Sequence, residues 1–570
     1  MHGGGHDRVP VEALMSPVVF RVPGSRFASR SWGSRHPRIG GMRAAVITSS
    51  RNVPSTGDSA TIDVAGPSRL PRSGGPSASD RIGRTMARKS ALFIVAVLAL
   101  NWSLSAQDAQ TVIAAAAKAI GADRLKTVQY SATGSDFVLG QAPNPASPWP
   151  RFINKSYSRS IDFEKPASRV DRVRVQGENP PRGGGQQPIV GEQPQSQTVI
   201  VDATTPWPQQ LEIWMMPHGF LRAAAARQAT VATKSVGGTK YTVVSFVGDN
   251  KAAVNGYINE KNLVERVETS IDNPFLGDMP FEALYSDYKD IDGVQFPMHM
   301  VQKQGGYPIF ELALTDVKVN APVTIQAPQG RGGPAAPAAA APPTPPAQSE
   351  KVGEDTYVIT GGYTVIAVGF KDHVTLIESG QNEPRALAVI AEVKRLFPNK
   401  PIRYVVNTHS HIDHSGGLRA FVAEGSTIIT HQVNKAYLEK VLSQPHTLNP
   451  DRAQQAKKKP VVVAMGEKRV LTDGAHTIEL YHLQNFSHHD GMIVAYLPKE
   501  KILLEADGYN PGAATAAPPS QPSPYTVSLV DNIQRLKLDV QRVVPVHYPA
   551  DNRVVTMAEV TKWAGRNSTN

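Results

Sequence analysis

Apolar and polar residues alternate with two different periods along the chain, and the period predicts which segments are helices and which are strands. Residues 108–120 carry apolar side chains at helical spacing, and Asp108 can cap the N-terminal end. We therefore expect a short amphipathic helix there. From residue 127 to 320 the pattern is mainly that of strands. The clearest candidates, rich in β-branched and aromatic residues, are 241–247, 253–258 and 263–269.

Two residue pairs between such runs are typical of tight hairpin turns, namely Asp292-Gly293 and Gly305-Gly306. We therefore expect residues 107–320 to form a curved, antiparallel, β-rich domain with one helix packed on it. A Gly-, Pro- and Gln-rich stretch, 179–197, predicts a long loop inside this domain. In pattern alone, without a motif, the domain resembles the half-barrels of periplasmic lipoprotein carriers. The sequence does not indicate its role.

A Pro- and Ala-rich segment, residues 321–350, separates this domain from the rest of the chain. Such a composition cannot form a packed core and is typical of a semi-extended linker. Residues 351–570 then alternate between strand and helix patterns, so the whole chain is expected to be α+β. The expected strands are 356–359, 364–368 and 374–378, and the expected helices are 384–397, 417–423, 527–538 and 557–563.

Positive charge is concentrated at the N-terminal end. The formal net charge is +11, and residues 1–85 alone hold twelve arginines, no lysine and five acidic residues. Residues 86–106 combine a short basic region, an apolar run and a small-residue end, which indicates a secretory signal peptide. We expect an exported protein, periplasmic or secreted, that starts at Met86, with 1–85 as a non-native extension. The alternative is a disordered basic arm before an internal anchor.

The rest of the chain argues against several classes of protein. No basic stripe with interleaved aromatic residues follows residue 107, so a nucleic-acid partner is not expected. No further stretch is apolar enough to span a membrane in the mature protein. The chain contains no cysteine, so it has no disulfides, and any metal site must use histidine and carboxylate ligands. A small-molecule substrate is the expected partner, and the oligomeric state is left open.

The strongest chemical motif is a histidine-rich turn after an apolar, strand-like run at 402–406. The turn contains His409, His411, Asp413 and His414 within six residues. On a tight turn His409 and His411 can point to one side, while Asp413 and His414 reach a second point a few ångströms away. Nitrogen and carboxylate ligands in that arrangement suit two adjacent divalent metals.

This motif resembles the HxHxDH signature of the metallo-β-lactamase fold superfamily, and the resemblance covers roughly residues 351–563. It implies an αββα sandwich and three further ligands. The family's spacing assigns these to His488, Asp507 and His547. Asp507 follows an apolar strand, and His547 follows a valine-rich one. His489 is the alternative to His488, and spacing favours His488.

Two positions depart from the family's pattern. Ala506 replaces the usual glycine before the bridging aspartate, and Glu378 replaces a frequent aspartate. Four other histidines of the region are expected to be structural or surface residues rather than ligands, namely His431, His446, His476 and His482.

The resemblance implies two metals, with Asp507 between them. The expected ligands are His409, His411 and His488 on the first metal, and Asp413, His414 and His547 on the second. Zinc is the default for such ligands, with manganese or iron as alternatives. A hydroxide bridging the metals would attack the substrate, and Asp413 would orient that nucleophile and pass on its proton.

These expectations describe an exported dinuclear-zinc hydrolase that cleaves an ester-like, lactone or amide substrate. One alternative is a metallo-β-lactamase acting on β-lactam antibiotics. The absence of cysteine excludes the lactamase subclass that uses a cysteine ligand. The other alternative is a periplasmic binding or carrier protein with an accessory metal domain.

Overall fold

The computed structural model describes residues 108–177, 182, 185, 188, 190–326 and 344–566. All of them fall within one compact unit of the chain, Ile82–Asn570. The expected extension 1–85 and signal peptide 86–106 lie outside the described residues, as does the middle of the expected linker. Within the described residues, no helix is long and apolar enough to cross a membrane.

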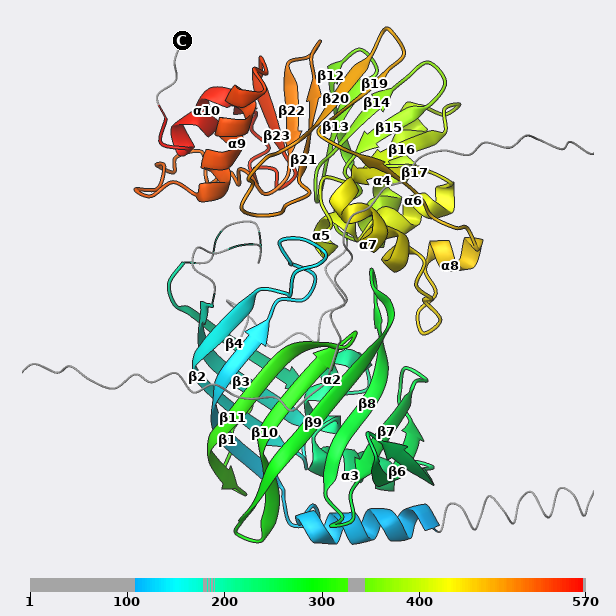
Figure 1. Cartoon of the computed structure of the whole chain (residues 1–570), viewed down its shortest axis with the longest axis vertical. Coiled ribbons are helices and arrows are strands. Elements are labelled where there is room, and N and C mark those ends of the chain that lie inside the picture. The colour runs from blue at the N-terminus through cyan, green and yellow to red at the C-terminus, as the bar shows by residue number, and fades with distance from the viewer. Residues whose placement is uncertain are drawn as a thin grey trace, which may run out of the picture. The chain divides into compact units, whose positions relative to one another are not determined.

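The N-terminal part is a single antiparallel sheet of eleven strands, in the order β4-β3-β2-β1-β11-β10-β9-β8-β7-β6-β5 (Figure 1). The strands are β1 Thr127–Phe137, β2 Arg151–Asp162, β3 Ala167–Gln176, β4 Gln193–Ile200, β5 Thr230–Val236, β6 Thr239–Val247, β7 Ala253–Ile258, β8 Val264–Asn273, β9 Gly277–Ile291, β10 Val294–Gln304 and β11 Tyr307–Val319. The expected β-rich architecture is therefore present.

Both expected hairpin turns are confirmed. Asp292 and Gly293 join β9 to β10 with φ of 51° and 77°, and Gly305 and Gly306 join β10 to β11 with φ of 58° and 89°. Two central residues with positive φ give a turn whose twist matches that of the flanking strands. These turns therefore help to fix the register of the hairpins.

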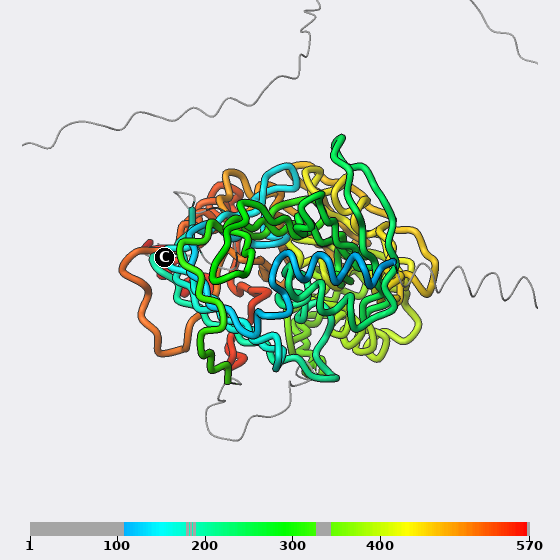
Figure 2. The backbone as a smooth tube through the Cα atoms, turned by 90° about the horizontal axis from the view of Figure 1, so that it is seen from below, coloured from blue at the N-terminus to red at the C-terminus, as the bar shows by residue number. Residues whose placement is uncertain are grey.

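The sheet curves around its helices. The expected helix at 108–120 is present, and its apolar face belongs to the core of the sheet; Figure 2 shows it in blue. The prediction of one helix was incomplete, because α2 (Trp207–Trp214) and α3 (Pro217–Ala225) also pack on the sheet. Helix α2 contacts both β3 and β8, which are far apart in the strand order. The sheet must therefore bend around this helix.

The predicted loop at 179–197 extends too far toward the C-terminus, because β4 begins at Gln193. This strand pairs only with β3 at the edge of the sheet, and half of its side chains are exposed, which suits its polar composition. A polar edge strand lacks the apolar alternation by which strands are predicted. The expected linker, 321–350, was likewise too long by three residues, because the edge strand β12 begins at Gln348.

The C-terminal part consists of two sheets face to face. The seven-stranded sheet contains β12 Gln348–Gly353, β13 Thr356–Thr360, β14 Val365–Gly369, β15 Val374–Ile377, β16 Ile402–Val406, β17 Thr427–His431 and β18 Val461–Met465. The six-stranded sheet contains β19 Lys468–Thr472, β20 Thr477–His482, β21 Ile493–Leu497, β22 Ile502–Glu505, β23 Arg542–Pro545 and β24 Val555–Thr556.

Helices cover the outer faces of both sheets. On the seven-stranded sheet these are α4 Glu383–Leu396, α6 Leu418–Glu424, α7 Gln432–Leu442 and α8 Arg452–Ala456, and on the six-stranded sheet α9 Pro524–Arg535 and α10 Met557–Trp563. Neighbouring residues of strand β16 point to opposite faces of the seven-stranded sheet. Val405 packs toward the helices, and Val406 packs between the two sheets. Strands buried on both faces are apolar throughout. This is the αββα sandwich that the family resemblance implied.

Candidate metal centre

The histidine-rich turn lies at the end of a buried strand. Strand β16 runs parallel to both β15 and β17, and its carboxyl end leads directly into residues 408–411. The four-residue helix α5 (Ile412–Ser415) follows at once and carries Asp413 and His414. The rigid strand and the short helix therefore present four of the expected ligands from one backbone segment.

The structure brings all seven expected ligands into two groups. Within each group, every residue offers a ligand atom, and these atoms lie within 4.8 Å of one another. The first group is His409, His411, His488 and Asp507, and the second is Asp413, His414 and His547. Their side chains are buried or partly buried. Histidine nitrogen and carboxylate oxygen at this spacing suit a divalent metal, typically zinc.

Asp507 connects the two groups. Its Oδ2 lies 3.3 Å from Nε2 of His409 and 3.0 Å from Nε2 of His488, both in the first group. The same oxygen lies 3.0 Å from Nε2 of His414, and Oδ1 lies 2.8 Å from Nε2 of His547, both in the second group. One carboxylate thus faces both clusters, the arrangement expected of a ligand shared by two cations.

The backbone around Asp507 is shaped to hold it there. Asp507 has φ of 56°, in the left-handed region that non-glycine residues rarely adopt. The Glu505 carboxylate accepts hydrogen bonds from the backbone N–H of Gly508 at 2.8 Å and of Tyr509 at 3.1 Å. Burial raises the pKa of Glu505 to about 8. These bonds close the turn that presents Asp507 to the clusters.

His411 has a ring nitrogen available for a metal. Its Nε2 lies 2.8 Å from the carbonyl oxygen of Ala142, which makes Nε2 the protonated nitrogen. Its Nδ1 is buried and has no hydrogen-bond partner among the described residues. Burial and the neighbouring His488 lower the pKa of His411 to about 3. A neutral imidazole with a buried free lone pair is the form that binds metal, so the residues present fit a metal ion.

His488 rather than His489 joins the first group. Nδ1 of His489 accepts a 2.9 Å hydrogen bond from the backbone N–H of Gly491, and its Nε2 lies 2.9 Å from Oγ of Ser410. Both nitrogens of His489 are therefore engaged, and it belongs to neither group. The geometry agrees with the register that spacing favoured.

Glu378 lies directly behind the clusters. It is fully buried, and its Oε2 is 3.6 Å from Nδ1 of His414. Its Oε1 accepts hydrogen bonds from the hydroxyl and the backbone N–H of Thr408. A carboxylate behind a ligating histidine fixes the orientation of the ring. The sequence showed Glu378 only as a departure from the family's pattern, and the structure gives it this contact.

The loop between β1 and β2 reaches the same place from the N-terminal sheet. Nε2 of Gln141 donates a 2.7 Å hydrogen bond to Oδ1 of Asp413, whose Oδ2 accepts one from the Tyr363 hydroxyl at 2.8 Å. The carbonyl of Gly140 accepts from the backbone N–H of Ile412 at 3.3 Å. A Cβ on Gly140 would lie 2.1 Å from Cγ2 of Ile412. The close approach therefore requires glycine.

Sequence reasoning missed this loop entirely. Residues 138–150 have no metal-ligand spacing and no sustained periodicity. The one local signal in the sequence is the glycine at position 140. The structure gives this glycine a φ of +70°. Nothing in the sequence connects that glycine to a turn some 270 residues later, as the Gln141–Asp413 separation of 272 residues illustrates.

Three other residues, His431, Glu467 and His482, also offer potential ligand atoms close together. The rings of His431 and His482 stack with centroids 4.0 Å apart. His482 uses Nδ1 toward Glu467 at 3.1 Å and Nε2 toward the carbonyl of Asp490 at 2.9 Å. Both of its nitrogens are therefore occupied, which agrees with the structural role expected for His482.

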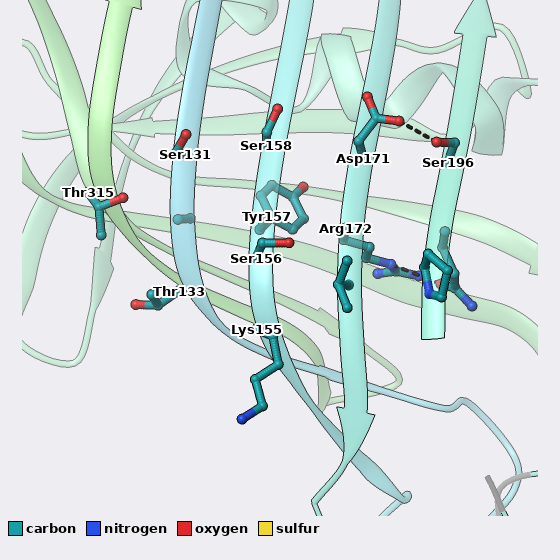
Figure 3. Close-up of a pocket in the computed structure, with 14 residues that line it drawn as sticks. Ser131, Thr133, Lys155, Ser156, Tyr157, Ser158, Asp171, Arg172, Ser196 and Thr315 are labelled. Atoms are coloured by element: carbon teal, nitrogen blue, oxygen red, sulfur yellow. Dashed lines mark hydrogen bonds between the residues drawn. The ribbon is translucent and has the colours of Figure 1, made fainter. Parts of the chain in front are cut away.

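A polar trough of about 610 Å³ crosses β1 to β4 (Figure 3). Hydroxyl and charged side chains line it, and some pair with each other: Asp171 accepts from Ser196, and Arg172 donates to Gln195 at 3.0 Å. None of the seven cluster residues lines this trough. It is therefore separate from the candidate metal centre.

The chain is similar to one protein family, one curated relative and several solved structures. Residues 358–547 match the family described as "Metallo-beta-lactamase superfamily". The alpha subunit of 2,4-dinitroanisole O-demethylase from Nocardioides sp. (strain JS1661) is 23% identical over 218 residues, which are 38% of this chain and 62% of that subunit. The chain thus spans less than two thirds of that relative's length.

Solved structures similar to this chain include metallo-beta-lactamases from two bacteria. The protein from Pontibacter korlensis is 18% identical, covers 38% of this chain and 99% of its own, and has a TM-score of 0.30. The protein from Hirschia baltica is 19% identical, covers 38% and 96%, and has a TM-score of 0.29. Because residues 358–547 match this family, the C-terminal region belongs to the metallo-beta-lactamase superfamily.

Proposed function

We propose that the protein is a hydrolase that holds two divalent cations, zinc in the first place, and cleaves a small ester-like, lactone or amide substrate. The observation that carries this proposal is the position of Asp507. Its carboxylate contacts two histidines of each cluster, at 2.8 to 3.3 Å. A carboxylate that contacts both clusters can act as a shared ligand when both clusters hold a cation.

Cations at these positions supply Lewis acidity and lower the pKa of water, which makes hydrolysis feasible near neutral pH. Among the chain's own groups, Asp413 is placed to take part in proton transfer. Gln141 and Tyr363 each donate a hydrogen bond to one of its two oxygens. Both donors restrict rotation of the carboxylate and so hold it in one orientation toward the centre.

The chemical class of the substrate is tested with a panel. Zinc-loaded protein is assayed on chromogenic β-lactam, lactone, thioester, aryl ester, amide and phosphodiester substrates. An aryl methyl ether is added because the curated relative is named a 2,4-dinitroanisole O-demethylase. His411→Ala is the blank, and His299→Ala on β10 is the matched control.

We expect turnover of one ester-like, lactone or amide class that disappears in His411→Ala and persists in His299→Ala. Turnover of β-lactams alone would establish the lactamase alternative instead. No turnover in the whole panel by protein that contains two zinc ions would contradict the proposed reaction class and favour a binding or carrier function.

We also propose that the protein is exported. The support is the signal-like sequence at 86–106. Mature protein recovered outside the cytoplasm with its N-terminus near Gln107 is the expected result. Cytoplasmic protein that retains residues 86–106 would contradict it.

A further inference from the structure

A cavity of about 740 Å³ opens beside the candidate metal centre. Ser410 and His411 form part of its wall, so the cavity adjoins the first cluster. The N-terminal sheet contributes Gly140, Ala142 and residues 144–149 of the β1–β2 loop and parts of two hairpins, and helix α7 contributes a further part of the wall. Its volume is in the range of small-molecule binding sites, roughly 300–1,000 Å³.

The lining of this cavity is largely apolar and aromatic. Trp149 and Tyr307 form a ring pair with centroids 5.4 Å apart and planes tilted by 45°. Leu276 and Met279 add aliphatic surface from the β8–β9 hairpin, and Tyr437 adds an aromatic ring from α7. Such a surface favours a flat, apolar group over a hydrated one.

Charge is scarce in the cavity. Its charged lining residues are Asp278 and Lys440. The Asp278 carboxylate already accepts hydrogen bonds from the backbone N–H and hydroxyl of Thr447, at 2.8 and 2.5 Å, and from the backbone N–H of Leu448 at 3.1 Å. Lys440 is exposed. A charged group of a substrate would therefore lose its hydration without gaining a buried counter-ion.

Hydrogen bonds fix the walls to the sandwich on both sides. On one side, the carbonyl of Pro143 accepts from the backbone N–H of Asp490 at 2.8 Å, and the Asn144 side chain donates to the Asp490 carboxylate at 2.6 Å. On the other side, the backbone N–H of Asp278 donates to the carbonyl of Pro445 at 2.8 Å. The cavity is therefore formed before any ligand enters it, which lowers the entropic cost of binding.

We propose that this cavity binds an uncharged, ring-bearing group of the substrate while the bond to be cleaved lies at the candidate metal centre. The second half of this statement rests on the proposed hydrolase function. The first half, that an uncharged aromatic group binds here, does not. The N-terminal sheet thereby contributes to substrate selection through Trp149 and its neighbours.

Binding is tested directly with 2-naphthol, an uncharged aromatic probe, by titration calorimetry on the full chain with and without zinc. Ala436→Trp places a ring in the cavity from an exposed position of α7, and Trp149→Ala removes part of the wall. Ala456→Trp, at an exposed position of α8 outside the cavity lining, is the matched control. We expect at least tenfold weaker binding in Ala436→Trp and in Trp149→Ala, and binding within twofold of the parent in Ala456→Trp.

Binding of 2-naphthol by Ala436→Trp and Trp149→Ala within twofold of the parent would overturn the assignment. Kinetics separate it from the proposed function, with 2-naphthyl acetate and ethyl acetate as substrates. If neither ester is cleaved but the probe still distinguishes the variants as expected, the cavity assignment stands and ester hydrolysis fails. If both esters are cleaved with a KM that Ala436→Trp leaves unchanged, the assignment fails and hydrolysis stands.

Discussion

Gln141 and Asp413 are 272 residues apart in the chain, yet the Gln141 side-chain amide donates a 2.7 Å hydrogen bond to Oδ1 of Asp413. The other oxygen of Asp413 accepts from the Tyr363 hydroxyl. The candidate catalytic carboxylate is therefore held from two sides, one of them the loop between β1 and β2. The N-terminal sheet takes a direct part in building the centre.

Gln141→Ala should lower kcat about tenfold, since removing groups that orient ligands or catalytic residues commonly costs 10- to 100-fold in activity or metal affinity. At saturating zinc the variant should keep its metal content, because every residue of the two clusters is retained. Steady-state kinetics with metal analysis checks this. Gln129→Ala, on β1, removes a comparable amide that bonds Ser160 and should leave kcat unchanged. An unaltered kcat in Gln141→Ala would show that Asp413 does not depend on this bond.

Gly140→Ala should disturb the centre through a single methyl group. Gly140 has φ of +70°, and the added Cβ would lie 2.1 Å from Cγ2 of Ile412, next to Asp413. Gly191→Ala is the matched control, because Gly191 has φ of +79° and nothing within 4 Å of its added Cβ. Both variants carry a left-handed strain of about 1 kcal/mol. Both variants should therefore lose some thermal stability, but only Gly140→Ala should also lose activity. Equal losses of activity and of thermal stability in the two variants would contradict the close contact.

His488→Ala should lose more zinc than His489→Ala. The Nε2 of His488 faces Oδ2 of Asp507 at 3.0 Å, whereas both nitrogens of His489 are engaged by Ser410 and Gly491. Zinc affinity is measured by competition with a chromogenic chelator. The reverse order would place the ligand one residue further along the chain.

His218 should make the fold sensitive to acid. It is fully buried, lies 3.3 Å from the carbonyl of Ile120 through Nε2, and stacks on Phe296. Burial lowers its pKa from 6.5 to about 4. Between these values the unfolded chain binds more protons than the folded one. Stability from this group is therefore complete above pH 6.5 and lost as the pH falls toward 4, by on the order of 1.4 kcal/mol per pH unit.

Denaturant unfolding at pH 7.5, 6 and 5 checks this by comparing the parent with His218→Gln, which keeps a donor but cannot titrate in this range. The variant should lose less stability on acidification. His299→Gln, at a partly exposed position on β10, is the control and should follow the parent. Parallel curves for the parent and His218→Gln would contradict the prediction.

The sequence predicted the parts of this protein that depend on local pattern. Val405 and Val406 belong to an apolar, strand-like run that the structure shows as a strand buried on both faces at these two residues, and the ligands expected from the family resemblance are brought together. The hairpin turn at Asp292 and Gly293 followed from the backbone freedom of its residues. The strand and turn signals lie within a few residues of the features they predict, whereas His488, Asp507 and His547 were assigned by the family resemblance.

What the sequence did not predict depends on distant contacts. The polar strand β4 (Gln193–Ile200) is held by its pairing with β3 rather than by apolar alternation. The contact of Glu378 with His414 and the position of Gln141 depend on how separate segments pack. A carboxylate or an amide in a loop has the same local appearance whether it faces solvent or a catalytic group.

The most direct test of the account is the zinc content of the parent and of Asp507→Ala, measured by equilibrium dialysis and elemental analysis, with circular dichroism to confirm folding. Asp507 faces both clusters, so we expect two zinc ions per chain in the parent and at most one, weakly held, in the folded variant. Two tightly bound zinc ions in Asp507→Ala, or no more than one in the parent, would contradict a dinuclear centre built around this carboxylate.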